Sequence, residues 1–285
     1  MMDDDTIRKI KERKEYLANL GYEYNESPKL SVIVTSFNQR DNIENLVHAL
    51  RKSRGVDEII VCEDGSVDGS LEEWDRWMER PNDIILRLND LHEIRSTDRA
   101  IRMTRSDICC IVQDDDEIQH HSWAEEALAL FDADEKLGVL GGMYGYHNFF
   151  ENMVVQWSGR KRNRPNARAK NKFSYVEHVN VGPYFIRKKY FDEIGGWDFN
   201  LSKPGEMGMG FDHELCYRMW LNGYRVGHYF PYKFLNDEQK GSTYSLGGFG
   251  GRSDRMKFME DYIFNKHGDR IKQVGKLVDE TVNRL

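Results

Sequence analysis

Acidic side chains gather at residues 112–117, in the stretch VQDDDE. Asp114, Asp115 and Asp116 are consecutive there and repel one another when they are ionised. Such a run is either a solvated turn, because water screens the repulsion, or a site for a hard divalent cation, because such ions prefer clustered oxygen ligands. The run by itself leaves both interpretations open.

Apolar strands alternate with amphipathic helices through the first half of the chain. Strands are predicted at residues 29–38, 56–66, 83–88 and 107–112, and helices at 41–52, 71–80 and 99–105. This alternation predicts an α/β fold with a parallel sheet covered on both faces. Ligands of such sheets bind outside the carboxyl ends of the strands. The predicted strands end in TSFN, CEDGS, LND and QDDDE, as expected of a nucleotide-binding edge.

Length, charge and cysteine usage narrow the class of protein. The 285 residues are enough for one large α/β domain with appendages, and the net charge of -7 argues against nucleic-acid binding. The apolar runs are strand-sized, so we expect no transmembrane segment, and the N-terminus lacks the apolar region of a secretory signal. The four cysteines lie in or beside apolar stretches without CxxC spacing. This predicts free thiols and a cytoplasmic location.

Five stretches, in this order, resemble the GT-A fold glycosyltransferases of family 2, which are inverting and use nucleotide sugars. They are LSVIVTSFN, EIIVCEDGSVDGS, IVQDDDE, YFIRKKYFDEIGGWD and GFDHELCYRMWLNGYRVGHYFP. The resemblance spans about residues 29–235. It implies a single GT-A domain, Rossmann-like, with a mostly parallel sheet and helices on both faces.

The resemblance also divides the chain into four parts. Residues 1–28 are an N-terminal helical extension, 29–122 the nucleotide-sugar-binding half, 123–236 the acceptor and catalytic half of the same domain, and 237–285 a glycine-rich loop with a helical tail. The tract at 237–254 is predicted to be a mobile loop, and its segment 241–251 is a candidate lid over the donor. The basic tract at 160–172 is either a solvated loop or a contact for the diphosphate or an anionic acceptor.

On the donor side, the resemblance assigns nucleobase recognition to Asp64, although an Asp in CEDGS can also simply cap a turn. Thr35 and Phe37 would line the same pocket, with Phe37 against the face of the base. Arg95 and Arg99, in NDLHEIRSTDRAI, are both candidates for the diphosphate. Surface charge is the alternative for these two arginines.

For the acidic run, the resemblance favours one register of the family's DXD motif. Gln113 then takes the position of the first Asp, Asp115 becomes the ligand of Mn²⁺ or Mg²⁺, and Asp114 lies near the ribose. The alternative register makes Asp114 and Asp116 the metal-binding pair. Gln113 departs from the family pattern, which leaves the exact ligand open.

On the acceptor side, Asp212 lies where the family carries its general base, in a motif whose first acid is here Phe211. Glu214 either supports or replaces Asp212, or forms an exposed salt bridge with Arg218 along the helix. The stretch GGWD matches the acceptor-side turn, where Trp197 either stacks on a sugar or is simply buried. His228 and Asp237 are weaker candidates for a further metal or phosphate ligand.

We therefore expect a metal-dependent inverting transferase that moves a sugar, most simply from a UDP-sugar, to a glycan or glycoconjugate hydroxyl. A membrane-bound acceptor would require only peripheral association. A nucleotidyltransferase is one alternative, but TSFNQRDN lacks a glycine- and basic-rich phosphate signature. A non-catalytic nucleotide-sugar or glycan-binding protein is the other, because Gln113 and Phe211 each replace an acid.

Overall fold

The structure is a computed structural model, and it describes residues 4–21, 25–142, 144–147, 154–157, 173–202, 207–229, 234–236 and 248–282. The strands are β1 (Leu30–Ser36), β2 (Glu58–Glu63), β3 (Ile84–Arg87), β4 (Ile108–Gln113), β5 (Asp116–Ile118), β6 (Leu137–Gly141), β7 (Tyr144–His147), β8 (Val154–Trp157), β9 (Phe173–Tyr175), β10 (His178–Val179), β11 (Tyr184–Arg187), β12 (Arg225–Tyr229) and β13 (Phe234–Asn236). The helices are α1 (Asp4–Asn19), α2 (Arg40–Lys52), α3 (Ser70–Trp77), α4 (His92–Met103), α5 (Trp123–Ala133), α6 (Lys188–Glu193), the 3-10 helix η1 (Phe199–Leu201), α7 (Phe211–Leu221), α9 (Gly248–His267) and α10 (Arg270–Val282).

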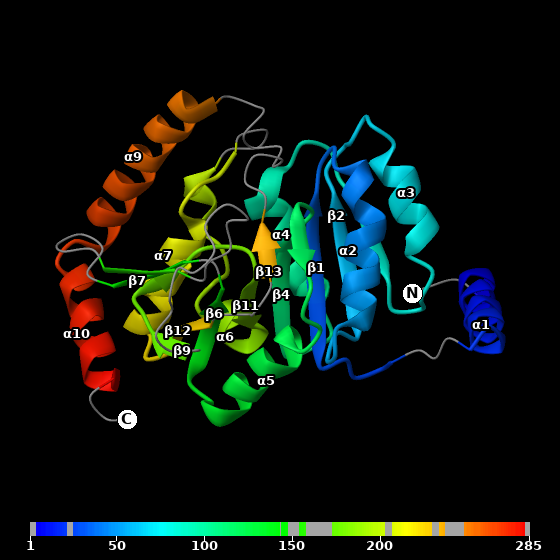
Figure 1. Cartoon of the computed structure of the whole chain (residues 1–285), viewed down its shortest axis with the longest axis horizontal. Coiled ribbons are helices and arrows are strands. Elements are labelled where there is room, and N and C mark those ends of the chain that lie inside the picture. Colours follow the sequence, from blue (N-terminus) through cyan, green and yellow to red (C-terminus); the bar gives the residue numbers. More distant parts are fainter. Residues whose placement is uncertain are drawn as a thin grey trace.

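An eight-stranded sheet forms the centre of the molecule, with the strand order β3-β2-β1-β4-β11-β6-β12-β9 (Figure 1). The first four of these strands are parallel to one another, and β11 runs antiparallel between β4 and β6. Thr35, near the end of β1, is in register with Cys62 of β2 and Gln113 of β4. The carboxyl ends of these three strands therefore lie side by side, and the loops that follow them share one edge of the sheet.

Alternate residues of the strands face two separate hydrophobic layers, as the two-residue period of a strand requires. On β1, Val32 and Val34 belong to the layer that packs against α2, α3 and α5. Ile33 belongs to the opposite layer, which packs against α4, α6, α7, α9 and α10. The long apolar runs at β1, β2 and β4 arise because both faces of these strands are buried.

The C-terminal helices lie against the second half of the sheet. In Figure 1, α9 (orange) runs beside α7, and α10 (red) follows below it. The N-terminal helix α1 (blue) lies at the opposite end of the molecule, outside the two helical layers. Within the described residues, no helix is long and apolar enough to cross a membrane.

The predicted order of strands and helices in the first half is confirmed, and the bounds of two predicted segments are corrected. The helix predicted at 99–105 begins already at His92. The loop predicted at 237–254 is wrong in its last part, because α9 begins at Gly248. Glycine costs about 1 kcal/mol per residue in a helix relative to alanine, so contacts made further along α9 must offset the glycines at its start. The basic tract at 160–172 and residues 241–247 lie outside the described residues.

Candidate active site

The loop after β1 and the first turn of α2 are hydrogen-bonded to the acidic turn that follows β4. The backbone N–H of Phe37 donates to Asp114 Oδ2 at 2.8 Å, and Asn42 Nδ2 donates to the carbonyl oxygen of Asp114 at 2.5 Å. Asn38 links the same loop to the CEDGS turn, since its N–H donates to Ser66 Oγ at 3.0 Å and its side chain accepts from Val67 N–H. Thr35 and Phe37 are both partly exposed at this edge.

The three aspartates of the acidic turn differ in burial and in hydrogen bonding. Asp114 is buried, and burial raises its pKa well above the usual value despite the bond from Phe37. Asp116 is also buried, and its Oδ2 accepts from the backbone N–H of Gln113 at 2.9 Å, which closes the turn. Asp115, at the turn itself, is partly exposed.

Asp64 fixes the start of α4 from across the sheet edge. Its two carboxylate oxygens accept from the backbone N–H groups of Leu91 and His92, at 2.8 and 2.7 Å. His92 has a φ of 58°, which is unfavourable for a residue with a side chain, so these bonds stabilise a costly conformation. Each carboxylate oxygen has a second lone pair, which leaves acceptor capacity for a ligand.

Glu93, in the first turn of α4, is a site residue that the sequence motifs did not indicate. Its Oε1 is buried and has no hydrogen-bond partner among the described residues. Burial raises the pKa of Glu93 to about 8, and the charges of Asp212, Asp115 and Asp116 add to the effect. The sequence predicts a helix only from residue 99, so Glu93 falls outside the predicted helix. The only sequence signal was an acid directly after the polar end of a strand.

Of the two arginines predicted near the diphosphate, Arg95 points toward the acceptor-side segment. Its guanidinium carbon lies 4.8 Å from the centre of the Phe199 ring, and Nη2 donates to the carbonyl oxygen of Ser202 at 3.4 Å. Arg99 is exposed on α4. Arg95 therefore contacts the acceptor-side segment, whereas Arg99 is exposed one turn further along the same helix.

Asp212 is the second residue of α7 and is only 7% exposed. Its Oδ2 accepts from the backbone N–H of Val181 at 3.0 Å, and its carbonyl oxygen accepts from the hydroxyl of Tyr184 at 3.0 Å. The positive end of the helix dipole also favours a carboxylate here. These contacts fix the carboxylate of Asp212 at the start of the helix.

Glu214, two residues further along α7, is fully buried within a group of basic side chains. Its carboxylate contacts Arg218 Nε at 2.8 and 2.9 Å, Lys266 Nζ at 2.7 Å and His267 Nε2 at 3.1 Å. Burial opposes its ionisation, but the contacts with His267, Arg218 and Lys266 outweigh that cost and lower its pKa. The exposed salt bridge considered for Glu214 and Arg218 is thus a buried one.

A layer of imidazole and phenol rings lies next to Asp212. The rings of His178 and His213 are 4.1 Å apart, and Tyr146 stacks on His178 at 4.7 Å. Burial lowers the pKa of both histidines, and the neighbouring His213 lowers that of His178 further. The two rings are therefore neutral near pH 7.

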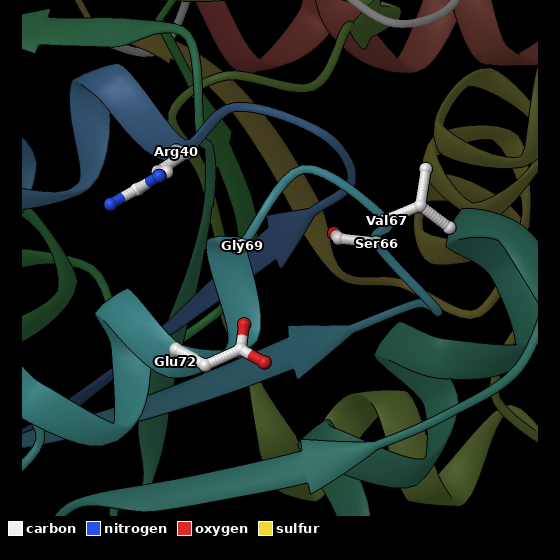
Figure 2. Close-up of a pocket in the computed structure, with 5 residues that line it drawn as sticks. All are labelled: Arg40, Ser66, Val67, Gly69 and Glu72. Atoms are coloured by element: carbon white, nitrogen blue, oxygen red, sulfur yellow. The ribbon is translucent and has the colours of Figure 1, made fainter.

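Trp197 is 4% exposed and packs edge-on against Phe211 at 4.9 Å, so the interpretation that it is simply buried holds. His228 is fully buried on β12, where burial lowers its pKa to about 4. Asp237 lies outside the described residues. A pocket of about 300 Å³ opens beside the CEDGS loop, lined by Arg40, Ser66, Val67, Gly69 and Glu72 (Figure 2).

The acidic turn has the chemistry of a divalent-cation site that is shared with a substrate. Within the described ranges, no group of three or more His, Cys, Asp or Glu side chains is arranged to hold a metal ion. Magnesium-like ions at nucleotide sites usually take one or two carboxylates and complete their shell with phosphate and water. Asp115 is partly exposed, and Glu93 Oε1 has no hydrogen-bond partner within the described ranges, so both carboxylates fit this requirement.

The comparison with family models decides the family. The model described as "Glycosyl transferase family 2" matches residues 31–195, more than half of the chain. The chain belongs to glycosyl transferase family 2. A search of curated proteins found no match.

Solved structures of GT-A proteins share the fold at low sequence identity. A structure of S. aureus TarS 1–349 with UDP-GlcNAc has a TM-score of 0.62 and 18% identity, over 90% of this chain and 72% of that one. The mannosyltransferase PcManGT from Pyrobaculum calidifontis, with GDP-Man and Mn²⁺, has a TM-score of 0.59 and 14% identity, over 95% and 76%. GalNAc-T7 with UDP, GalNAc and Mn²⁺ has a TM-score of 0.60 and 14% identity, over 90% and 55%.

The chain covers 43% of the length of a longer TarS structure, with a TM-score of 0.54. At these low sequence identities, the similarity to the solved structures shows a shared fold only. The prediction of a family 2, GT-A chain is confirmed.

Proposed function

We propose that this family 2 chain is a metal-dependent inverting glycosyltransferase, which moves a sugar from a nucleoside diphosphate donor to a hydroxyl of a glycan or glycoconjugate. One observation carries the proposal. Glu93 Oε1 is buried with no hydrogen-bond partner among the described residues, and the charges of Asp212, Asp115 and Asp116 all act on this carboxyl group. This supports the proposal that the candidate base and the candidate metal ligands share one acidic site.

On the donor side, Asp64 would accept from the nucleobase with its remaining lone pairs, and Thr35 and Phe37 would line the base pocket. Asp115 would hold Mn²⁺ or Mg²⁺, with Asp114 near the ribose and Asp116 closing the turn beneath. When bound, the cation offsets the negative charge on the departing nucleoside diphosphate. Arg99, exposed on α4, is a better candidate for a diphosphate contact than Arg95, which lies over Phe199.

On the acceptor side, Asp212 would remove the proton of the attacking hydroxyl, while that hydroxyl attacks the anomeric carbon opposite the leaving group. Asp212 suits this role better than Glu214. The carboxylate of Glu214 already contacts Arg218, Lys266 and His267 and is fully buried. Glu214 therefore supports the helix that carries the base.

The donor is proposed to be UDP-linked, and the structural relatives set the first compounds to test. TarS was solved with UDP-GlcNAc and PcManGT with GDP-Man, so a panel of UDP- and GDP-sugars should be compared in the presence of Mn²⁺. The four cysteines are buried and free, which supports a reducing compartment such as the cytoplasm. Contact with a membrane-bound acceptor would then be peripheral.

The test of the base is Asp212→Asn, which keeps an acceptor oxygen for the N–H of Val181 but cannot take a proton. We expect transfer to fall by at least about 100-fold, in line with the usual contribution of a general base. Calorimetry should show unchanged Mn²⁺-dependent binding of UDP. Turnover close to that of the wild type would mean that Asp212 is not the base.

The test of the metal role is Asp115→Ala, measured by the same calorimetry. We expect UDP affinity to lose its Mn²⁺ dependence, whereas Asp75→Ala, at an exposed aspartate of α3, should leave it intact. Equal Mn²⁺ dependence in both variants would remove Asp115 from the metal site. Binding of a nucleotide sugar without turnover of any donor would favour a non-catalytic binding protein instead.

A further inference from the structure

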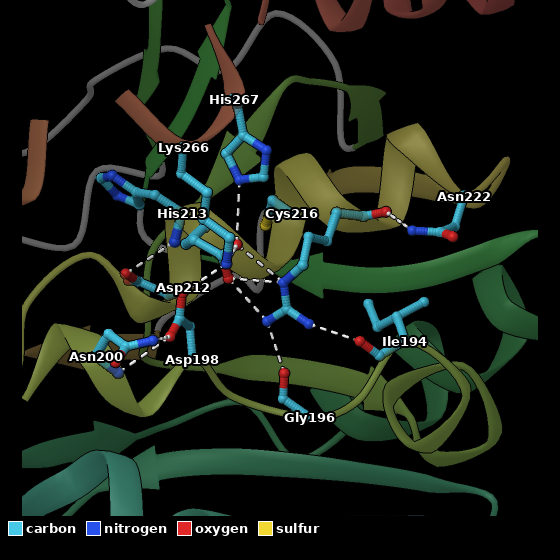
Figure 3. Close-up of polar contacts among 12 residues, drawn as sticks. Ile194, Gly196, Asp198, Asn200, Asp212, His213, Cys216, Asn222, Lys266 and His267 are labelled. Carbon is cyan, nitrogen blue, oxygen red and sulfur yellow. Dashed lines mark hydrogen bonds and ion pairs between the residues drawn. The ribbon is translucent and has the colours of Figure 1, made fainter. Parts of the chain in front are cut away.

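A charged network joins α7, the turn before η1 and the end of α9 (Figure 3). Arg218 of α7 donates to the carbonyl oxygens of Ile194 and Gly196, at 2.9 and 2.6 Å. Lys266 of α9 contacts Glu214 on α7 and Asp198 in the turn, at 2.7 and 2.5 Å. Three segments that are far apart in the sequence are thereby held together by side-chain contacts.

Lys266 is the cation shared by both carboxylates of this network. Asp198 is 2.6 Å from the hydroxyl of Tyr262 and also accepts from the N–H of Asn200. Burial alone would favour the neutral acid, yet the contacts with Lys266, Tyr262 and Asn200 lower the pKa of Asp198 to about 2. Removal of one partner from a buried ion group leaves an uncompensated charge. Without Lys266, Glu214 and Asp198 would lose the contact that ties one to the other.

Helix α9 also contacts the segment that leads into α7. The guanidinium of Arg255 donates to the carbonyl oxygen of Met207. Met259 packs on Gly210, the residue before α7, so closely that a Cβ atom there would lie 1.8 Å from its Cγ. Gly210 has a φ of 76°, which favours glycine on its own account. Helix α9 thus contacts the described parts of 198–214 on both sides of Asp212.

We propose that α9 positions the base helix, and that Lys266 is a positioning residue which fixes Asp212 relative to the acceptor-side turn at Asp198. The inference rests on the proposed role of Asp212. Asp212 lies only two residues before Glu214 on the same rigid helix, α7. A shift of Glu214 therefore also moves the carboxylate of Asp212. Lys266 acts through Glu214 and Asp198. The donor-side residues Asp64 and Asp115 lie on loops that this network does not include.

The experiment compares Lys266→Met, Lys266→Arg and Lys257→Met, and uses the full chain with the best donor from the nucleotide-sugar panel. Lys257 is an exposed lysine of the same helix, so its variant controls for the loss of one positive charge. Each protein is tested for transfer to the acceptor, for Mn²⁺-dependent UDP affinity by calorimetry and for unfolding in urea.

We expect Lys266→Met to lower kcat for transfer by about 10- to 100-fold, the scale that a small misplacement of a catalytic group produces. Its UDP affinity should stay within about twofold of the wild type, because the positioning effect is confined to the acceptor half. Lys266→Arg can still bridge two carboxylates and should recover most of the rate. Lys257→Met should match the wild type.

Two outcomes would overturn the positioning role. One is transfer by Lys266→Met within about twofold of the wild type. The other is a parallel loss of UDP affinity and transfer, which would mean that Lys266 supports the fold in general. Asp212→Asn, assayed alongside, separates the two hypotheses. If it keeps its turnover, the base assignment fails, whereas if it is inactive while Lys266→Met is active, only the positioning role fails.

Discussion

Replacement of Glu93 by glutamine should stabilise the protein at alkaline pH. Burial and the charges of Asp212, Asp115 and Asp116 raise the pKa of Glu93 from 4.5 to about 8. The unfolded chain loses this proton near pH 4.5, and the folded chain keeps it until about pH 8. The contribution of the Glu93 carboxyl to the free energy of unfolding is therefore fully present below pH 4.5. It is lost as the pH rises from 4.5 through about 8.

The interval between the two pKa values corresponds to about 5 kcal/mol, at about 1.4 kcal/mol per pH unit. Glu93 is partly exposed, and solvent screening reduces this upper limit, so we expect a gain of about 2 kcal/mol for Glu93→Gln at pH 8.5. At pH 4.5 the neutral acid and the amide are nearly equivalent, and the gain should vanish.

The assay is urea unfolding in the presence of a chelator at pH 4.5, 6.5 and 8.5. Glu72→Gln, at an exposed glutamate of α3, controls for the change of one charge. The same Glu93→Gln variant should bind Mn²⁺ and UDP more weakly, because it loses a carboxylate that interacts electrostatically with Asp115. A gain in stability that is equal at all three pH values would refute the explanation by a buried, charge-crowded carboxyl.

Two other substitutions test packing and titration at separate places. Gly210→Ala should destabilise the protein by about 2–4 kcal/mol more than Gly223→Ala. Both glycines have a positive φ, but among the described residues a Cβ atom would meet a neighbour, Met259, only at Gly210. Equal losses in urea unfolding would contradict this packing. His228, whose pKa burial lowers to about 4, stabilises the fold above pH 6.5 and loses that contribution as the pH falls toward 4. His228→Leu should therefore gain about 2–3 kcal/mol relative to the wild type between pH 6.5 and 4, and an unchanged pH profile would refute it.

Much of the donor half could be predicted from local patterns. The apolar runs at 29–38 and 107–112 predict buried strands because both of their faces are covered, and β1 and β4 lie there. Asp114, Asp115 and Asp116 follow directly, so their place at the carboxyl edge of the sheet follows from strand direction alone. The division of roles among them does not, because it depends on the bonds from Phe37 and Gln113.

The residues that sequence reasoning missed are those whose importance depends on distant partners. Glu93 becomes a site residue only because α4 begins at His92, which Asp64 holds from another strand end. Lys266 is one charge among many on α9 until the fold brings it to Glu214 and Asp198. The sequence around each of these two residues has the composition and spacing of an ordinary exposed helix.

The sequence by itself determined the strand and helix order, the edge where chemistry gathers and the family, because hydrophobic period and motif order are local properties of the chain. Only the tertiary structure decided which acids stay buried and which have cationic partners. Glu214 is fully buried among cations, whereas Glu93 has a buried oxygen with no partner in the part of the chain that the structure describes. A carboxylate's charge and role depend on its burial and on the charges nearby, and those neighbours come from segments that the linear sequence keeps far apart.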